Sequence, residues 1–485
     1  MKTIEFDRDI EACAAAWGAS GAVAVCKDGQ FCFAQYYGTE IEEKSTYCLP
    51  YRNRFLMGLC IGKLLDEGTL DLSYTLDRWI PEYTHAAEIT LGQLCLKQSG
   101  VPDFLNGQMM KELQKEPYYQ KMDAKHRNLE ERRLAVYPWS LEEVLARING
   151  KNLNVVPGTE PTDDLVNLSE TVLIEEVIRR ASGQTLEEYI DREIFAPLAV
   201  CAKKGKADTI SYAAWRGGEF MSSSPKDPEN GLFLLDAEGA KGLLEAVVSR
   251  KLLSEAAWEV ISRPAAWGQG IAFQLFGGMM CARAFSYGSL GWNCSLCCDW
   301  NLGLGILYLT NREDRVYYTN AGVRYFQKEL LETVAAAFVY PHDTKLVRFC
   351  ADYVWDAMRL TISEEQLEFM NSAQRAICIA YAYEQELFLL MEGNRTVGLI
   401  AFSVNQEKKQ YYVESVLIDQ KFQKRGFGTI MLRKGLEYLE SLGCRYLTIG
   451  VNRFNVAAQK LYSAVGFTEK TVYEDFIEME KDMCL

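Results

Sequence analysis

The segment Gln423-Lys424-Arg425-Gly426-Phe427-Gly428 is well suited to hold an anion. It lies between a predicted strand, residues 411–418, and a predicted helix that starts near Gly428. Glycine has no Cβ, so main-chain N–H groups can approach a ligand closely there. The positive end of the helix dipole adds to the attraction. This combination suits a diphosphate, although glycines are also ordinary in any turn that joins a strand to a helix.

A second segment, further along the chain, places an aromatic hydroxyl on a short helix. Asn455 is a favourable helix N-cap and Gly466 a favourable helix end, so the residues between them are predicted to be helical. Ala458 is small, and Tyr462 follows on a later turn. Tyr462 is therefore a candidate for chemistry, with a purely structural aromatic residue as the alternative.

In this order, the two segments resemble the GNAT superfamily of acyl-CoA N-acyltransferases. The Q/R-x-x-G-x-G/A motif of that family, which holds the CoA diphosphate, matches at Gln423, Gly426 and Gly428. Its N-x-x-A-x-x-L-Y-x-x-x-G-F segment matches at Asn455, Ala458, Leu461, Tyr462, Gly466 and Phe467. The resemblance covers about residues 345–485. It implies a mixed α/β domain that uses acetyl-CoA as cosubstrate and needs no metal.

The resemblance also implies roles for individual residues. Tyr462 would lie near the CoA sulfur as the general acid, because a tyrosine with an ordinary pKa of about 10 can protonate a thiolate of similar basicity. An N–H group near Val416 would serve as the oxyanion donor. The predicted CoA contacts are Val416, Leu417, Ile418, Gln423, Lys424, Arg425, Gly426, Phe427, Gly428, Thr429, Asn455 and Tyr462.

The general base is harder to identify from the sequence. If strand alternation holds, Glu414 points to the same face as Val416 and Ile418. It would then be a candidate to accept the amine proton, directly or through water. A solvated or structural glutamate is the alternative.

A finer resemblance, to the bacterial polyamine acetyltransferase branch, concerns the acceptor. That branch carries L-x-x-x-x-E-Q-x-x-F, as in residues 360–369, and I-D-x-x-Y-Q-G-K-G-Y-G, which is similar to residues 418–428 with Phe422 in place of the first tyrosine. Three glutamates of the first stretch could pair with a cationic chain or simply favour a helix start: Glu364, Glu365 and Glu368. A small polyamine-like amine is expected, with aminoglycoside or peptide amines as alternatives.

Residues of about 15–340 resemble the serine β-lactamase and penicillin-binding-protein superfamily, closest to its class C or esterase branch. Several short stretches carry the resemblance in the right order: residues 21–29, 64–72, 89–91, 99–103, 194–198, 287–292 and 309–312. The expected fold class is therefore multidomain α+β, a β-lactamase/transpeptidase-like α/β domain followed by a GNAT α/β domain.

The catalytic residues of that superfamily do not carry over. Its S-x-x-K motif corresponds to Tyr51-Arg52-Asn53-Arg54, and arginine stays charged and cannot act as a base. Its Y-x-N element should fall at residues 163–167, which hold no tyrosine, and its K/H-T-G element becomes Ser289-Leu290-Gly291. We expect a pseudoenzyme domain that binds a ligand or serves as an oligomerisation or positioning module. A hydrolase with a relocated nucleophile, such as Ser169, is the alternative.

Composition and length limit the remaining choices. A chain of 485 residues with 48% apolar and 24% charged residues indicates two or three globular domains. The best boundary is at Pro341, because proline cannot extend the preceding helix, giving domains 1–340 and 341–485. Residues 345–357 and 364–380 are predicted helices. The net charge of −14 argues against general nucleic-acid binding.

The cysteines and the N-terminus bear on the compartment. The first residues do not resemble a secretory signal, and no apolar run is long enough to span a membrane. We therefore expect a cytoplasmic protein with buried free thiols and no membrane partner, and leave homo-oligomer formation open. Cys294, Cys297 and Cys298 form a C-x-x-C-C cluster, but the strand-like surroundings disfavour a metal site. A CoA-binding sensor is the main rival to an enzyme.

Overall fold

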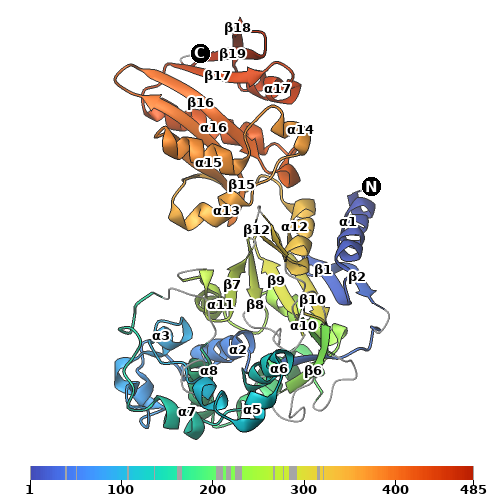
Figure 1. Cartoon of the computed structure of the whole chain (residues 1–485), viewed down its shortest axis with the longest axis vertical. Helices are drawn as coiled ribbons and strands as arrows, with labels where there is room; N and C mark the ends of the chain where they lie inside the picture. Colours follow the sequence, from blue (N-terminus) through green and yellow to red (C-terminus); the bar gives the residue numbers. More distant parts are fainter. Residues whose placement is uncertain are drawn as a thin grey trace. The chain divides into compact units, whose positions relative to one another are not determined.

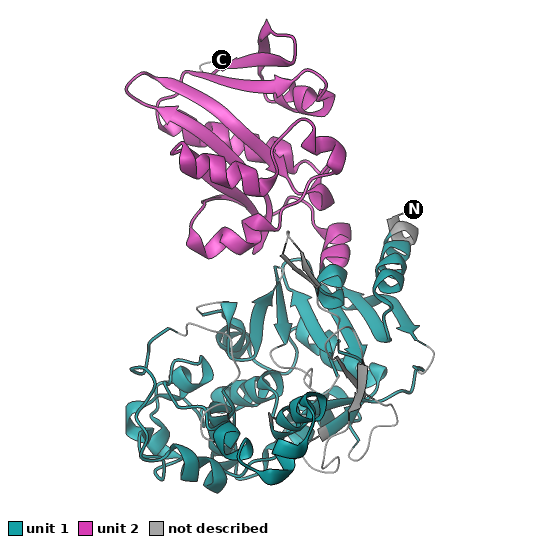
Figure 2. Ribbon diagram, in the orientation of Figure 1, with its two compact units in different colours: residues 1–316, 325–331 teal, residues 317–324, 332–485 magenta. Residues whose placement is uncertain are grey.

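The computed structural model describes residues 2–38, 41–50, 52–105, 109–135, 137–160, 167–203, 211–214, 220–223, 232–265, 268–276, 278–282, 292–313, 317–319 and 322–483. The chain forms two compact units, residues 1–316 with 325–331 and residues 317–324 with 332–485 (Figure 2). The division runs through helix α12, Phe326–Phe338. The boundary at Pro341 stays a prediction. Among the described helices, none is long and apolar enough to cross a membrane.

Unit 1 is built on a six-stranded sheet of order β2-β1-β10-β9-β8-β7 (Figure 1). The chain's first two strands form a hairpin, since β1 and β2 pair antiparallel from Gly21↔Tyr37 to Lys27↔Gln30. The strands are β1 Gly21–Lys27, β2 Gln30–Tyr37, β7 Phe273–Phe276, β8 Met279–Ala282, β9 Ser295–Asp299 and β10 Leu304–Thr310. Shorter pairs in this unit are β3 Tyr47–Pro50 with β6 Leu232–Leu235 and β4 Ser211–Ala214 with β5 Phe220–Ser223. A further short pair, β11 Tyr317–Thr319 with β12 Gly322–Arg324, belongs to unit 2.

Helices cover this sheet and form a helical part beside it. Helix α10 packs on β1, β9 and β10, while α2 packs on α8 and α11. The main helices are α2 Arg54–Asp66, α8 Leu168–Ser182, α10 Ala237–Val248 and α11 Glu255–Ser262. The others are α1 Lys2–Trp17, α3 Leu91–Cys95, α4 Met110–Leu113, α5 Pro117–Lys121, α6 Ala124–Ala135, α7 Leu141–Ile148 and α9 Leu186–Ile190.

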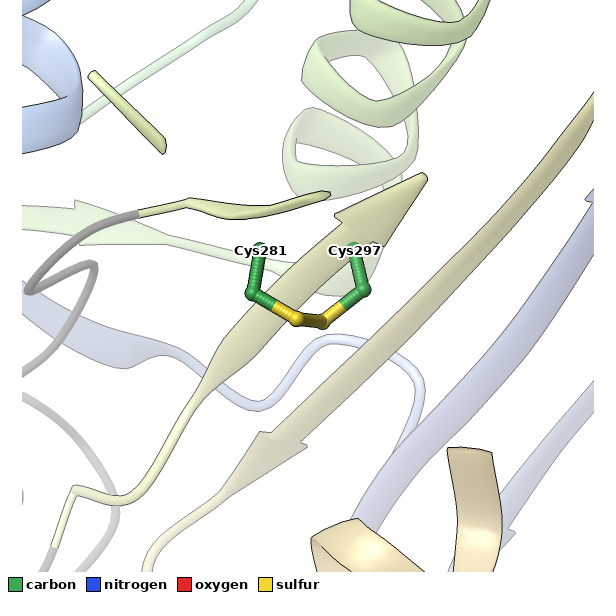
Figure 3. The surroundings of a disulfide bond; sticks show 2 residues. All are labelled: Cys281 and Cys297. Carbon is green, nitrogen blue, oxygen red and sulfur yellow. A yellow bond between two sulfur atoms is a disulfide. The ribbon is translucent and has the colours of Figure 1, made fainter. Parts of the chain in front are cut away.

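A disulfide bond joins Cys281 on β8 to Cys297 on β9 (Figure 3). The two residues are direct partners in the antiparallel ladder, with their Cα atoms 4.0 Å apart, so their side chains lie on the same face of the sheet. The expectation of free thiols is wrong for these two. Cys298 follows Cys297 on the strand and therefore points to the opposite face, where it joins the main core as a buried free thiol.

Unit 2 contains a seven-stranded sheet of order β13-β14-β15-β16-β17-β19-β18. Neighbouring strands are antiparallel except for β16 and β17, which run parallel. The strands are β13 Thr344–Arg348, β14 Glu386–Glu392, β15 Arg395–Asn405, β16 Gln410–Ile418, β17 Tyr446–Asn452, β18 Thr468–Val472 and β19 Phe476–Asp482. The helix expected from residue 345 is wrong at its start, because β13 pairs with β14 there.

Helices lie on both faces of this second sheet. One face packs against α13, Val354–Met358, and α15, Ala373–Ala382, through a cluster that includes Leu389, Leu399 and Leu417. The other face carries Phe402 and Ile400, which lie against Gly435 of α16, Phe427–Ser441. The remaining helices are α14 Glu364–Leu367 and α17 Val456–Ala464.

Candidate active site

The two parallel strands of unit 2 separate where the site is expected. The pairing of β16 with β17 covers Tyr411–Val413 and ends there, while β16 stays paired with β15 as far as Ile418. A β-bulge lies at the point of separation, because Phe402 pairs with Val413 and Ala401 with Ser415, which leaves Glu414 as the extra residue. Beyond Val413, β16 is paired with β15 but no longer with β17.

The predicted anion-binding turn follows β16 directly. Gly426 is the N-cap of α16 with φ 92°, a left-handed conformation that favours glycine. Lys424 also has a positive φ, of 60°, and is exposed. At Gly428 a Cβ would lie 3.1 Å from the Leu461 side chain of α17, so this residue keeps the two helices close. The first turn of α16 contains no acidic residue, so nothing in it offsets the positive end of the helix dipole.

The side chain of Gln423 is turned toward the protein. Its amide exchanges two hydrogen bonds with Gln366 of α14, at 3.1 and 3.0 Å, and donates a third to the carbonyl of Ile418 at 2.9 Å. Gln423 therefore fixes the turn to the end of β16 and to α14. Its direct contact with CoA stays a prediction.

Tyr462 lies on α17 and is only 7% exposed. Asn455 caps this helix, accepting a hydrogen bond from the N–H of Ala458 at 3.1 Å. Burial raises the pKa of Tyr462 above its ordinary value, and the nearby Tyr412 adds to the rise. Tyr462 thus keeps its proton at neutral pH.

Tyr412 is a residue that the sequence reasoning missed. It precedes the bulge on β16, and its hydroxyl lies so close to β17 that a Cβ on Gly450 would be 2.5 Å from it. Burial raises the pKa of Tyr412, and the charges of Glu414 and Glu478 contribute. In the sequence, Tyr412 differs from other tyrosines only in lying two positions before Glu414. Its importance becomes visible only when β17 is placed beside β16.

Glu414 is exposed and accepts a hydrogen bond from Ser403 of β15 at 2.5 Å. Ser403 shares a face with Ala401, toward α15, whereas Val416 pairs with Ile400 and faces α16. The alternation that would have put Glu414 on the face of Val416 is interrupted by the bulge. That expectation is wrong, while a role for Glu414 as base stays a prediction.

The acidic residues of α14 lie in or directly after a short, capped helix. Ser363 forms a capping box with Gln366, and Glu364 and Glu365 occupy the first turn, where the helix dipole favours carboxylates. Both are exposed, as is Glu368. This arrangement agrees with the dipole interpretation and does not test binding of a cationic chain.

In unit 1, Arg54 is the residue that the sequence resemblance aligns with the lysine of the S-x-x-K motif. It lies in the first turn of α2, buried, with its Nη2 3.2 Å from Glu170, and Ser99 donates a hydrogen bond of 2.6 Å to the same carboxylate. Ser169 is buried, donates to the carbonyl of Pro102 at 2.8 Å and accepts from the N–H of Phe104. Tyr51, residues 163–166 and residues 289–291 lie outside the described residues.

Comparisons with known proteins match each unit separately. A Beta-lactamase family model matches residues 6–326, and a model of the Acetyltransferase (GNAT) family matches residues 351–467. FmtA from Staphylococcus aureus is similar in fold, with a TM-score of 0.50 at 12% identity, over 69% of this chain and 86% of that one.

Two of the curated proteins that this chain resembles are N-acetyltransferases. An uncharacterized N-acetyltransferase from Methanocaldococcus jannaschii is 27% identical over 103 residues, 20% of this chain and 46% of the relative. The [Ribosomal protein bS18]-alanine N-acetyltransferase of Salmonella typhimurium is 27% identical over 106 residues, 20% of this chain and 72% of that protein. This chain therefore spans less than half of the first of these relatives.

Proposed function

Because the chain belongs to the beta-lactamase family and carries a GNAT acetyltransferase domain in its C-terminal part, we propose that it transfers acetyl from acetyl-CoA to a primary amine. The observation that carries the proposal is the turn at Gly426, which leads from the separated strand β16 into the N-terminal end of α16, whose first turn holds no acidic residue. That end suits the CoA diphosphate, and β16 suits the pantetheine arm.

Transfer proceeds by direct attack in a ternary complex. The neutral amine nitrogen attacks the thioester carbon, the new C–N bond forms, and the C–S bond breaks as the carbonyl re-forms. An N–H group near Val416 stabilises the oxyanion. Tyr462 gives its proton to the departing thiolate, and the amine proton passes to Glu414, directly or through water. Tyr462 keeps its proton at neutral pH, so the proton is available for this step, while the raised pKa makes it a weaker acid than an ordinary tyrosine.

The acceptor is a small polyamine-like amine or, as the second candidate, the α-amine of a peptide. The exposed carboxylates Glu364 and Glu365 are compatible with the first. The second is favoured by the Salmonella relative, which by name acetylates an alanine of a ribosomal protein. Use of acetyl-CoA supports a cytoplasmic location.

Unit 1 is proposed to be non-hydrolytic. The buried pair of Arg54 with Glu170 supports this, because the guanidinium stays charged and its carboxylate partner neutralises it in place. A ligand-binding or positioning role remains for this unit. Covalent labelling of a serine by a fluorescent penicillin would refute the non-hydrolytic assignment.

The test is incubation of the full chain with acetyl-CoA and a panel of amines, read by mass spectrometry. The panel contains spermidine, spermine, an aminoglycoside, a lysine peptide and peptides with free α-amines. Acetylated polyamine identifies the first acceptor, and peptides acetylated only at the α-amine identify the second. Acetyl-CoA binding without any product would instead support the sensor interpretation, and absence of acetyl-CoA binding would overturn the proposal.

A further inference from the structure

The diphosphate turn makes contacts that reach outside the residues matched by the GNAT family model. Arg425, at the third position of the motif, does not extend into solvent as Lys424 does. Its Nη1 donates a hydrogen bond of 2.8 Å to the carbonyl of Val339, directly after the end of α12. Its guanidinium also lies 5.1 Å from the ring centroid of Tyr340. These contacts place a permanent cation at the negative end of a thirteen-residue helix.

Two further contacts join the same segments. Lys421, two residues before Gln423, forms an ion pair with Glu332 of α12, and both side chains are partly buried. Pro341 lies 4.0 Å from the position that a Cβ on Gly426 would take. Val339 is fully buried, and all of these residues belong to unit 2.

The segment that follows α12 is itself held in place. The buried carboxylate of Glu392 accepts hydrogen bonds from the N–H groups of His342 and Asp343, at 3.1 and 2.9 Å. Residues 332–343 are therefore attached to the acetyltransferase sheet at one end and to the diphosphate turn along their length. The family model begins only at residue 351.

We propose that residues 332–343 are a built-in support of the CoA site, which holds the turn 423–428 in its binding conformation through Arg425 and Lys421. This inference rests on the proposed use of acetyl-CoA. Lys424 supplies the exposed positive charge for the diphosphate, whereas Arg425 and Lys421 act as positioning residues.

The sign of one charge effect separates support from direct binding. Glu332 is an anion close to a site for a polyanion, so removing its charge should strengthen CoA binding if only Coulomb forces act. If Glu332 instead holds the turn through Lys421, removing its charge should weaken binding. The two cases differ in direction and not only in size.

The experiment measures the Kd of acetyl-CoA for the full chain by calorimetry, with thermal unfolding as the folding check. Glu332→Gln should raise the Kd about two- to fivefold without lowering the unfolding temperature. The matched control is Glu386→Gln, which removes an ion-pairing glutamate of similar side-chain exposure, 27% against 24%, on β14 of the same unit. The control should leave the Kd unchanged.

A charge exchange completes the test. Glu332→Lys and Lys421→Glu should each weaken binding, and the double variant should recover most of the affinity. Unchanged or tighter binding by Glu332→Gln, or a double variant as weak as Lys421→Glu alone, would overturn the inference. A wild-type chain that binds no acetyl-CoA would instead overturn the proposed function, so the two failures are distinguishable.

Discussion

The hydroxyl of Tyr412 on β16 lies against Gly450 on β17, one residue beyond the last pair of the parallel ladder. A Cβ on Gly450 would be 2.5 Å from the hydroxyl oxygen and 3.8 Å from the ring carbon that bears it. The hydroxyl oxygen is therefore the atom that would have to shift to admit a side chain at this position. The pair lies where the strands begin to separate. Tyr412 interacts electrostatically with Glu414 and with Tyr462, the proposed base and acid.

The variant Gly450→Ala is expected to reduce acetyl transfer, because the new methyl group displaces the Tyr412 hydroxyl. Overpacking of this kind typically costs about 1–3 kcal/mol. Adding Tyr412→Phe removes the oxygen and should restore the stability lost in Gly450→Ala. The measurements are thermal unfolding and kcat for both single variants and the double variant. If the double variant is no more stable than Gly450→Ala, the hydroxyl is not the cause of the strain.

Tyr462→Phe is expected to lower kcat by about 10²-fold or more, the range of a lost general acid, with little change in the Kd of acetyl-CoA. The raised pKa of Tyr462 means that the wild-type rate should show no loss from Tyr462 ionisation below about pH 10. Steady-state kinetics between pH 7 and about pH 10 test both statements. A variant with wild-type kcat would remove Tyr462 from the mechanism.

The same pKa shift predicts a pH dependence of stability. Tyr462 ionises in the unfolded chain near its ordinary pKa of about 10 but only at higher pH in the folded protein. Its stabilising effect is complete below about pH 10 and is lost as the pH rises toward the folded-state pKa. Tyr462→Phe should therefore flatten the fall in unfolding temperature of unit 2 above about pH 10. Parallel curves for the two proteins would contradict this expectation.

Features that depend on local sequence could be predicted, whereas those that depend on strand pairing could not. The start of α16 at Gly426 and the cap at Asn455 follow from residues next to each other in the chain. The bulge at Glu414 depends on the register with β15. Lys345 to Arg348 form a strand that pairs with β14, about forty residues further along the chain, and the local sequence alone wrongly predicts a helix there.

Gln423 and Gln366 are expected to act as one unit in holding the diphosphate turn, since each amide donates to the other. Gln423→Ala and Gln366→Ala should each raise the Kd of acetyl-CoA. The double variant should be no weaker than the worse single variant, because either change removes the same pair. Calorimetric titration of the three variants measures the coupling. Effects that simply add would show that Gln423 acts through CoA itself and not through Gln366.

The buried ion pair of unit 1 predicts a stability effect that does not depend on acetyl transfer. Arg54→Met leaves the Glu170 carboxylate buried without this cation, while the Ser99 hydroxyl still donates to it. Loss of one member of such a pair typically destabilises by about 3–5 kcal/mol. Adding Glu170→Gln removes the charge and should recover much of that loss, because a neutral amide can still accept the hydrogen bond from Ser99. Calorimetric unfolding of both variants measures the difference, and acetyl transfer by unit 2 should be retained at temperatures where unit 1 is folded. A double variant no more stable than Arg54→Met would mean that packing around Arg54, and not charge compensation, maintains this site.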